Sequence, residues 1–434
     1  MHAATVFGRV RRIMLRTSAL AAVVCGVGLL TGAGCPTLPS DGASGVFNNV
    51  TDRTNGGADY IGSAACMACH PDVGAKQMVH GHAQALHAID DGAPTYPAAG
   101  IWGGGFDPPD GKPWSDIAYV IGGYIRDAKF VDLDGFVMTD GVDGVHTQWN
   151  LAFPDNGAVA QFVAYLPDQA TPLPYAYSCF VCHVTGAVES DPDSPTFQDN
   201  RPGMAGTFAE PGVQCEVCHG PGSNHAPSPH ARQIYVDTTG LTCRECHVGS
   251  YRSQDRTIAA SGGYIVQTQQ QRELWASGGH STFSCVFCHE PHVSANYDTQ
   301  AAIINDCEDC HPDFDLGFHA GKTYVRRAYS EALTCRSCHM PYATLTASAA
   351  GEDVVGDVGR MADTHTHIFR INTENADYTA MFTESGEAVA VDAEGRAAVT
   401  VDFVCLRCHN GFGNASRFRV RDASAIARSI HVSN

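Results

Sequence analysis

The 434-residue chain is short of basic residues and has no long apolar run beyond its first 30 residues. Lys and Arg number 27 against 46 Asp and Glu, which gives a formal net charge of −19. Because a surface of that sign repels phosphate backbones, nucleic acid is excluded as a partner and a basic protein fits better. A hydrophobic share of 44% is typical of a globular chain, and the missing apolar runs exclude a multi-span membrane protein.

The first 59 residues have the pattern of an exported chain. Four arginines precede an apolar run over residues 19–30, which small residues and then Cys35 follow. This pattern predicts a signal peptide over residues 1–34. Cys35 occupies the place of a bacterial lipoprotein's lipid-bearing cysteine and is a lipidation candidate, and plain cleavage near Ala33 or Gly34 is the alternative. Residues 35–59 are rich in Gly, Ser, Asn and Asp, which predicts a flexible tether.

Sixteen of the 18 cysteines lie in one repeated five-residue pattern, Cys-x-x-Cys-His. At these residue frequencies about 0.04 copies would be expected by chance. The copies, numbered first to eighth in chain order, are Cys66/Cys69/His70, Cys179/Cys182/His183, Cys215/Cys218/His219, Cys243/Cys246/His247, Cys285/Cys288/His289, Cys307/Cys310/His311, Cys335/Cys338/His339 and Cys405/Cys408/His409.

The spacing of the pattern is that of c-type haem attachment. Two thiols three positions apart can each form a thioether with one vinyl group of a haem, and the next residue's imidazole becomes the proximal iron ligand. Four-cysteine zinc sites and redox dithiols also use Cys-x-x-Cys, but neither needs a histidine after every second cysteine. We therefore predict eight covalently bound c-type haems as the cofactors. Every proximal position is His, and the Cys-x-x-Cys-Lys variant of ammonia-forming nitrite reductases does not occur.

The density of the motifs predicts the fold class. Six motifs crowd into residues 178–348, too few residues for each haem to have a separate polypeptide core. We predict a mainly α and irregular chain around a haem-packed core, with the haems close enough for electron transfer between them. The remaining segments are a first haem segment (60–112), a β-rich insertion (113–177) and a C-terminal segment with the eighth haem (349–434).

Two stretches predict β-structure. Alternating apolar residues with Gly-containing turns predict a small antiparallel sheet over residues 116–166. A second alternation, interrupted by Ala393-Glu394-Gly395, predicts a β-hairpin over residues 388–404 that delivers the eighth motif from a strand.

Histidines outside the motifs decide whether each iron transfers electrons or binds substrate, because a second imidazole closes the remaining axial position. A predicted helix over residues 72–88 would carry three of them, and a predicted helix over residues 423–430 precedes another. In His365-Thr366-His367, alternation lets only one imidazole face a given haem. The candidate distal ligands are His80, His82, His87, His225, His280, His292, His319, His365, His367 and His431. His146 and His230 are weaker candidates, and methionines 67, 78, 340 and 361 are read as packing residues before ligands. No catalytic residue is predicted.

Three stretches resemble bacterial multihaem c-type cytochromes, in particular the superfamily of tetrahaem cytochromes, octahaem hydroxylamine oxidoreductases and octahaem tetrathionate or nitrite reductases. They are the first motif followed by Gly-His82-Ala, the third motif followed by Gly-Pro-Gly-Ser-Asn-His225, and the seventh motif followed by Met-Pro. The resemblance implies that His82 and His225 are distal ligands and that parallel and perpendicular haem pairs alternate.

The resulting prediction is an exported octahaem cytochrome, periplasmic or at the outer membrane or cell surface, that carries electrons along mostly bis-histidine haems. Its partners would be redox proteins, especially other cytochromes, and a membrane through the lipid at Cys35. Two alternatives are an octahaem oxidoreductase acting on nitrite, hydroxylamine or tetrathionate, and a self-associating subunit of an extracellular cytochrome filament.

Overall fold

The computed structural model describes residues 49–90, 92–97, 105–229, 233–249, 254–266 and 268–431. The chain divides into two compact units, Met1–Ser44 and Gly45–Asn434, and the described residues all belong to the second. The predicted signal peptide, Cys35 and His230 therefore lie outside the described residues. Within these residues no helix has the length and apolar character needed to cross a membrane.

The haem-attachment motifs lie on or beside single helical turns. A spacing of three residues brings two cysteines to the same side of a helical turn, so one haem can reach both. The turns are α1 (Ser63–Met67), α4 (Tyr177–Phe180), α5 (Cys215–His219), α6 (Leu241–Cys246), α8 (Cys285–Cys288), α10 (Cys307–Cys310), α11 (Cys335–His339) and the π-helical turn η5 (Asp402–Leu406).

The other helices are also short. They are α2 (Pro71–Met78), α3 (Asp140–Asp143), α7 (Gln270–Trp275), α9 (Thr299–Ala302), α12 (Glu352–Val355) and α13 (Val420–Ala427), with the 3-10 turns η1 (Trp114–Asp116), η2 (Gln198–Asn200), η3 (Gly317–His319) and η4 (Tyr378–Met381).

The predicted helix over residues 72–88 is wrong beyond its first two turns. Helix α2 begins at Pro71, a favoured first helical residue, and ends at Met78. Residues 80–85 turn, and Leu86–Ala88 form strand β1, whose backbone pairs with β2. The predicted helix over residues 423–430 instead runs from Val420 to Ala427.

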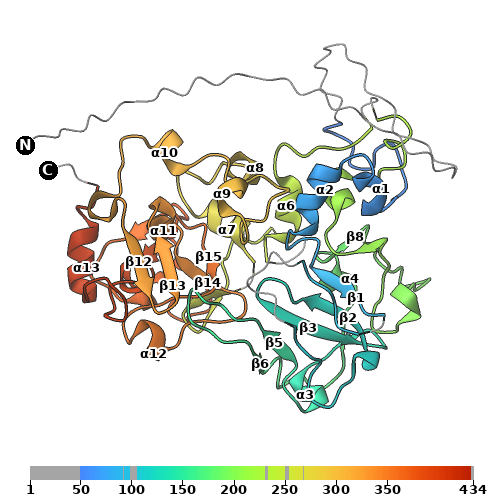
Figure 1. The fold of residues 1–434 in the computed structure, drawn as a ribbon, viewed down its shortest axis with the longest axis horizontal. Coiled ribbons are helices and arrows are strands. Elements are labelled where there is room, and N and C mark those ends of the chain that lie inside the picture. The colour runs from blue at the N-terminus through green and yellow to red at the C-terminus, as the bar shows by residue number, and fades with distance from the viewer. Residues whose placement is uncertain are drawn as a thin grey trace, which may run out of the picture. The chain divides into compact units, whose positions relative to one another are not determined.

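A seven-stranded sheet dominates the early part of the fold and lies at the lower right of Figure 1. Its strands are β1, β2 (Ile117–Gly122), β3 (Asp127–Asp132), β4 (Phe136–Val137), β5 (Gln148–Asn150), β6 (Gln161–Val163) and β7 (Leu173–Pro174). The order is β1-β2-β3-β4-β7, β5 pairs with β3 and β6, and every pairing is antiparallel.

Both faces of this sheet are buried. One face, with Tyr119 and Val131, packs against Tyr175 and against Phe180 of α4. The opposite face, with Val120 and Phe130, packs in a separate apolar cluster. The sheet therefore lies directly against the turn that carries the second motif.

Four smaller sheets join the remaining segments. They are β10 (Ala260–Ser261), β11 (Tyr264–Val266), β14 (Tyr342–Leu345) and β15 (Thr364–His365) in one sheet, and the pairs β12 (Thr323–Arg326) with β13 (Tyr329–Ala332), β8 (Val184–Thr185) with β9 (Glu210–Pro211), and β16 (Ile371–Asn372) with β17 (Val399–Thr400). The largest apolar cluster, which includes Ile265, Ile368 and Phe403, lies among the C-terminal elements.

The predicted hairpin over residues 388–404 does not form. The chain does turn at residues 392–396, but β17 pairs in parallel with β16. Val389 instead donates its backbone N–H to Ile258 and forms a bridge with Phe382. Alternation correctly marked the inward-facing valines but could not choose between neighbouring and distant partners. The eighth motif follows β17 on η5.

A buried ion pair joins the seventh and eighth motifs. Arg407, inside the eighth motif, is 2% exposed and contacts the Glu331 carboxylate of β13 at 2.7 and 2.8 Å. It also donates to the Ser337 carbonyl of α11 at 3.0 Å. Burial opposes ionisation of Glu331, but the charge and hydrogen bonds of Arg407 outweigh it and lower the pKa of Glu331 to about 2.

We expect Arg407→Met to lower the free energy of unfolding by about 3–5 kcal/mol, because it leaves the Glu331 carboxylate buried without a cation. The Glu331 contribution is present above its ordinary pKa and is lost as pH falls from about 4.5 to about 2, so the defect should shrink in acid. Denaturant unfolding at several pH values measures both effects. The matched control is Arg421→Met, whose pair with Asp422 is 74% and 42% exposed and should change stability by less than about 0.5 kcal/mol. Equal losses in the two variants would contradict the assignment.

Candidate haem-binding sites

Fifteen of the sixteen motif cysteines are free thiols. The exception is Cys69, which is disulfide-bonded, so attachment of haem at the first motif requires that thiol in its reduced state. The turn geometry of the previous section presents the paired thiols together, which is the donor arrangement that two thioether bonds need.

Motifs that are distant in sequence lie in contact. Side-chain hydrogen bonds join Cys66 to Cys215, Cys182 to Cys246, and Cys243 to Cys285. These contacts connect the first motif with the third, the second with the fourth, and the fourth with the fifth.

The later motifs continue the series. Cys288 lies within electrostatic range of Cys307, and Cys335 donates to Glu308 at 3.2 Å beside Cys307. Cys405 lies within electrostatic range of Cys338. Since Cys218 also acts on Cys243, all eight motifs form one connected set.

Seven of the eight motif histidines face a second histidine from elsewhere in the chain. The pairs, with distances between ring centroids, are His70–His225 at 6.4 Å, His247–His82 at 6.0 Å, His219–His292 at 6.0 Å, His311–His280 at 5.9 Å, His289–His367 at 6.2 Å, His409–His319 at 6.1 Å and His339–His431 at 5.9 Å. Rings in direct contact are closer, such as Tyr342 and His365 at 3.9 Å. Each pair therefore leaves a gap between its imidazoles.

Hydrogen bonds at Nδ1 orient several of these rings. His219, His339 and His409 donate from Nδ1 to the carbonyls of Tyr235, Phe369 and Ser416 at 2.9, 2.8 and 2.6 Å. His292 uses Nδ1 toward Glu290 at 2.7 Å. A hydrogen bond at Nδ1 leaves Nε2 as the nitrogen available to a metal.

Burial keeps the paired imidazoles neutral. Desolvation lowers the pKa of His82 well below its usual range and that of His367 to about 3. A neutral imidazole has the free lone pair that metal ligation requires. The paired rings, the free thiols and the buried, hydrogen-bonded histidines fit haem, which would be held by the motif cysteines and by both imidazoles of a pair.

Three candidate distal ligands are not in these pairs. His80 stacks on His82 at 4.4 Å and accepts the His82 backbone N–H. His87 meets the Tyr96 ring edge-on at 4.7 Å, and His365 stacks on Tyr342 while donating from Nδ1 to the Met340 carbonyl. In the His-x-His segment, only His367 lies opposite a motif histidine.

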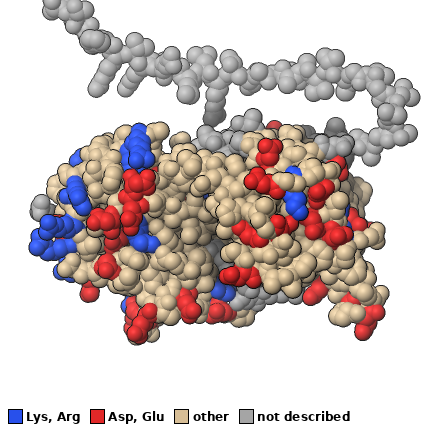
Figure 2. Space-filling view, turned by 90° about the horizontal axis from the view of Figure 1, so that it is seen from below, with Lys and Arg blue, Asp and Glu red and all other residues tan. Residues whose placement is uncertain are grey.

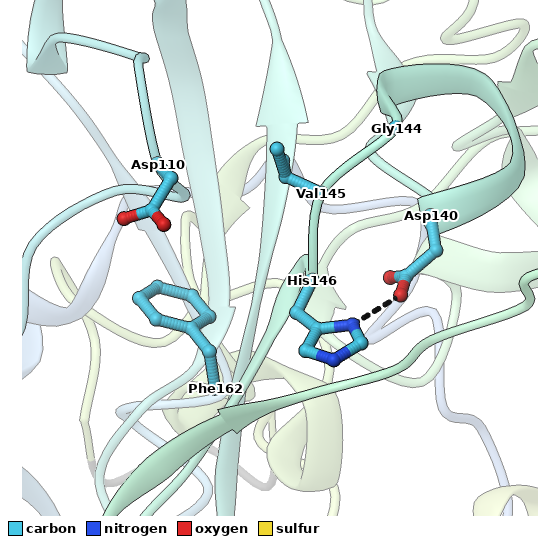
Figure 3. Close-up of a pocket in the computed structure, with 6 residues that line it drawn as sticks. All are labelled: Asp110, Asp140, Gly144, Val145, His146 and Phe162. Carbon is cyan, nitrogen blue, oxygen red and sulfur yellow. Dashed lines mark hydrogen bonds and ion pairs between the residues drawn. The ribbon is translucent and has the colours of Figure 1, made fainter.

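His146 lies in a surface pocket apart from the motifs. Its Nδ1 pairs with Asp140 at 2.7 Å, and Asp110 and Phe162 line the other side of the pocket (Figure 3). With its side chain 60% exposed, His146 has the setting of a solvated histidine. Of the methionines, Met361 is buried and accepts from Arg326, which is a packing role.

The second motif is the exception among the eight. His183 donates from Nδ1 toward the Ala85 carbonyl at 3.3 Å, and its nearest aromatic contact is Tyr175 at 6.4 Å. Across the part of the chain that the structure describes, no histidine ring is paired with His183.

Two buried glutamates position ligand-bearing segments, and sequence reasoning missed both. Glu273 of α7, which is fully buried, accepts the backbone N–H of His367 at 2.6 Å and the hydroxyl of Thr366 at 2.8 Å. Glu216, inside the third motif, accepts backbone N–H groups of Gly62 and Gly222 at 2.9 and 2.7 Å. Glu216 thus fastens both the start of α1 and the loop that leads to His225. No local pattern marks either residue, because their partners are remote in sequence.

Comparison with known proteins points to the same class of cofactor. Residues 165–220, which contain the second and third motifs, match the family model described as cytochrome c554 and c-prime. No curated protein sequence matches the chain. The chain is thus similar, over this stretch, to c-type cytochromes, which supports covalently bound c-type haem and electron transfer.

Three solved structures also match. Outer cell wall cytochrome OcwA is 19% identical, with 71% of this chain and 79% of that chain covered and a TM-score of 0.41. The octaheme sulfite reductase MccA of Wolinella succinogenes is 15% identical, with 83% and 67% covered and a TM-score of 0.48. The undecaheme S-layer cytochrome of Carboxydothermus ferrireducens is 17% identical, with 88% and 61% covered and a TM-score of 0.38.

We expect Glu273→Ala to release the segment that carries His367 and to convert part of the fifth haem from low-spin to high-spin, because a distal imidazole without its backbone anchor no longer stays in place. Magnetic circular dichroism of the oxidised protein measures the high-spin share. Glu273→Gln keeps an acceptor oxygen and should retain most of the low-spin signal. The exposed Glu394→Ala is the control and should change nothing. A normal spectrum in Glu273→Ala would remove the positioning role.

Proposed function

We propose that the chain is an exported octahaem c-type cytochrome that transfers electrons along a series of haems, most of them held between two histidines. The observation that carries the proposal is the set of seven histidine pairs with ring centroids 5.9 to 6.4 Å apart. Two imidazoles on one iron leave no position for substrate, so such haems serve electron transfer.

The contacts between motifs support a continuous route. The attachment cysteines bind the vinyl edge of a haem, so contact between two motifs brings two haem edges together. The route follows the motif contacts from the first motif through the third, fourth, fifth, sixth and seventh to the eighth, and the second motif joins it at the fourth.

Surface charge favours redox proteins as partners. On the face in Figure 2, acidic side chains are spread widely while basic side chains gather toward one end. Arg417, Arg419, Arg421 and Arg428 are exposed on and beside α13, close in sequence to the eighth motif. Opposite charges at two ends of a route suit partners of opposite charge for donor and acceptor.

The histidine pairs also bear on self-association. In each of the seven pairs both imidazoles come from this chain, so those haems need no ligand from a neighbouring subunit. A conducting filament completed by histidine exchange between subunits therefore has no support from these sites.

We expect the purified protein to contain eight haems per chain and to show at least seven low-spin irons. A pyridine haemochrome assay gives the haem count, and electron paramagnetic resonance gives the spin states. The nearly parallel rings of His219 and His292, at 4°, and the nearly perpendicular rings of His319 and His409, at 76°, should give two distinguishable kinds of low-spin signal. Fewer than eight haems, or several high-spin irons, would contradict the proposal.

We expect Cys35→Ala to move the protein from the membrane fraction to the soluble exported fraction, because a lipid chain at Cys35 is the proposed anchor. Fractionation of producing cells with haem-stained gels measures this. Cys25→Ala, within the proposed signal peptide, is the matched control and should leave the distribution unchanged. Export without membrane association of the parent chain would rule out the lipid anchor and leave plain cleavage.

A further inference from the structure

The second motif differs from the other seven in its distal side. His183 uses Nδ1 toward the Ala85 carbonyl, so Nε2 is the nitrogen left for iron. The nearest candidate in sequence, His87, lies on β1 two residues after Ala85. Neighbouring residues of a strand point to opposite faces, and Leu86 packs on the face that meets Phe180 of the second motif. His87 therefore lies on the other face, where its ring contacts Tyr96.

The same sheet places polar side chains around the second motif. Strand β3 carries Lys129, which forms an ion pair with Asp127 and lies 5.2 Å above the ring of Tyr165. The charges of Lys129 and Asp127 act on His183, and Tyr165 lies within electrostatic range of Cys179. These three side chains form a cluster next to a site whose other walls are apolar.

Tyr175 adds a second, independent observation. Its ring lies 6.4 Å from that of His183, and the residue is only 2% exposed. Its hydroxyl has no hydrogen-bond partner within the described part of the chain, which is costly for a buried polar group. An unpaired buried donor of this kind is suited to a ligand that arrives later.

We propose that the haem attached at Cys179 and Cys182 keeps its distal position free of histidine and binds a small anion there, beside Lys129, Tyr165 and Tyr175. This inference rests on the proposed function, because it requires a haem at the second motif. The ligand class follows from charge: Lys129 supplies the cation nearest to His183, and a ferric haem itself favours anionic ligands. The open haem stands at the end of the side branch, so electrons from the main route can reach a bound ligand.

The test uses the oxidised holoprotein with cyanide as the probe. Electron paramagnetic resonance should show one high-spin iron per chain. A cyanide titration should remove that signal with a stoichiometry of one cyanide per chain. The haem assay is run on the same sample, so a count below eight marks failure of the proposed function, whereas eight haems that are all low-spin and do not respond to cyanide overturn the open site alone.

Matched lysine variants test the role of the sheet. Lys129→Met should weaken cyanide binding about tenfold, the effect of losing one charged hydrogen-bond donor. Lys112→Met is the control, because Lys112 lies in the same insertion and is ion-paired with Asp143 at 3.2 Å. Equal cyanide affinity in the two variants would overturn the part assigned to Lys129. Haem content should stay at eight in both, which separates a local effect from misfolding.

Two further results would overturn the open site. If His230 supplied the missing ligand, the parent protein would be fully low-spin and a high-spin signal would arise only in His230→Ala. If a histidine of a second copy supplied it, the high-spin signal would grow on dilution. We expect His230→Ala to leave the single high-spin signal unchanged and dilution to have no effect.

Discussion

The need of each haem for a ligand that its own motif cannot supply controls the path of this chain. Cys-x-x-Cys-His provides two thiols and one imidazole within five residues, so attachment is local and occurs on one helical turn. The opposite imidazole must come from elsewhere. His82, which follows the first motif, lies against the fourth motif's His247, and His431, at the far C-terminal end, lies against the seventh motif's His339. Each such pair joins two segments that have no other reason to meet, so proposed haem ligation would act as a set of long-range cross-links.

This division between local and distant partners explains which features the sequence could predict. The motifs depend only on spacing within five residues, and the β-rich stretch depends on alternation, so both can be read locally. The helix predicted over residues 72–88 stopped at Met78 because β2 offered residues 86–88 a better backbone partner, which no helical pattern reveals. The hairpin at residues 388–404 failed for the same reason, since β16 rather than the neighbouring segment pairs with β17. In His365-Thr366-His367, sequence showed that one histidine had to face away but not which one.

Buried carboxylates complete what the cross-links leave loose, and these are the features that sequence could not predict at all. Glu216, Glu273 and Glu331 are each buried or nearly so, and each accepts hydrogen bonds from a segment that holds a motif or a paired histidine. A chain with short helices and few residues per haem has little apolar polypeptide area for positioning such segments. Charge-assisted hydrogen bonds to backbone N–H groups are directional and stronger than neutral ones, so they can set the position of a loop with a single side chain. Their partners lie far along the chain, which is why no window of sequence identifies them.

The branch at the fourth motif gives the arrangement its functional logic. In a simple row, an open haem at any internal position would interrupt the bis-histidine series and expose the route to ligands. The motif contacts instead join the first motif to the third and fourth directly, and the second motif touches the fourth from the side through Cys182 and Cys246. Ligand binding at the second haem would therefore leave the proposed main route from the first to the eighth motif intact. The β-rich insertion lies against this side branch, so its role is best understood as building the surroundings of one haem and not as a cover for the whole series. The part of the chain with the fewest haems thus accounts for the one site at which the series can differ from a plain electron carrier.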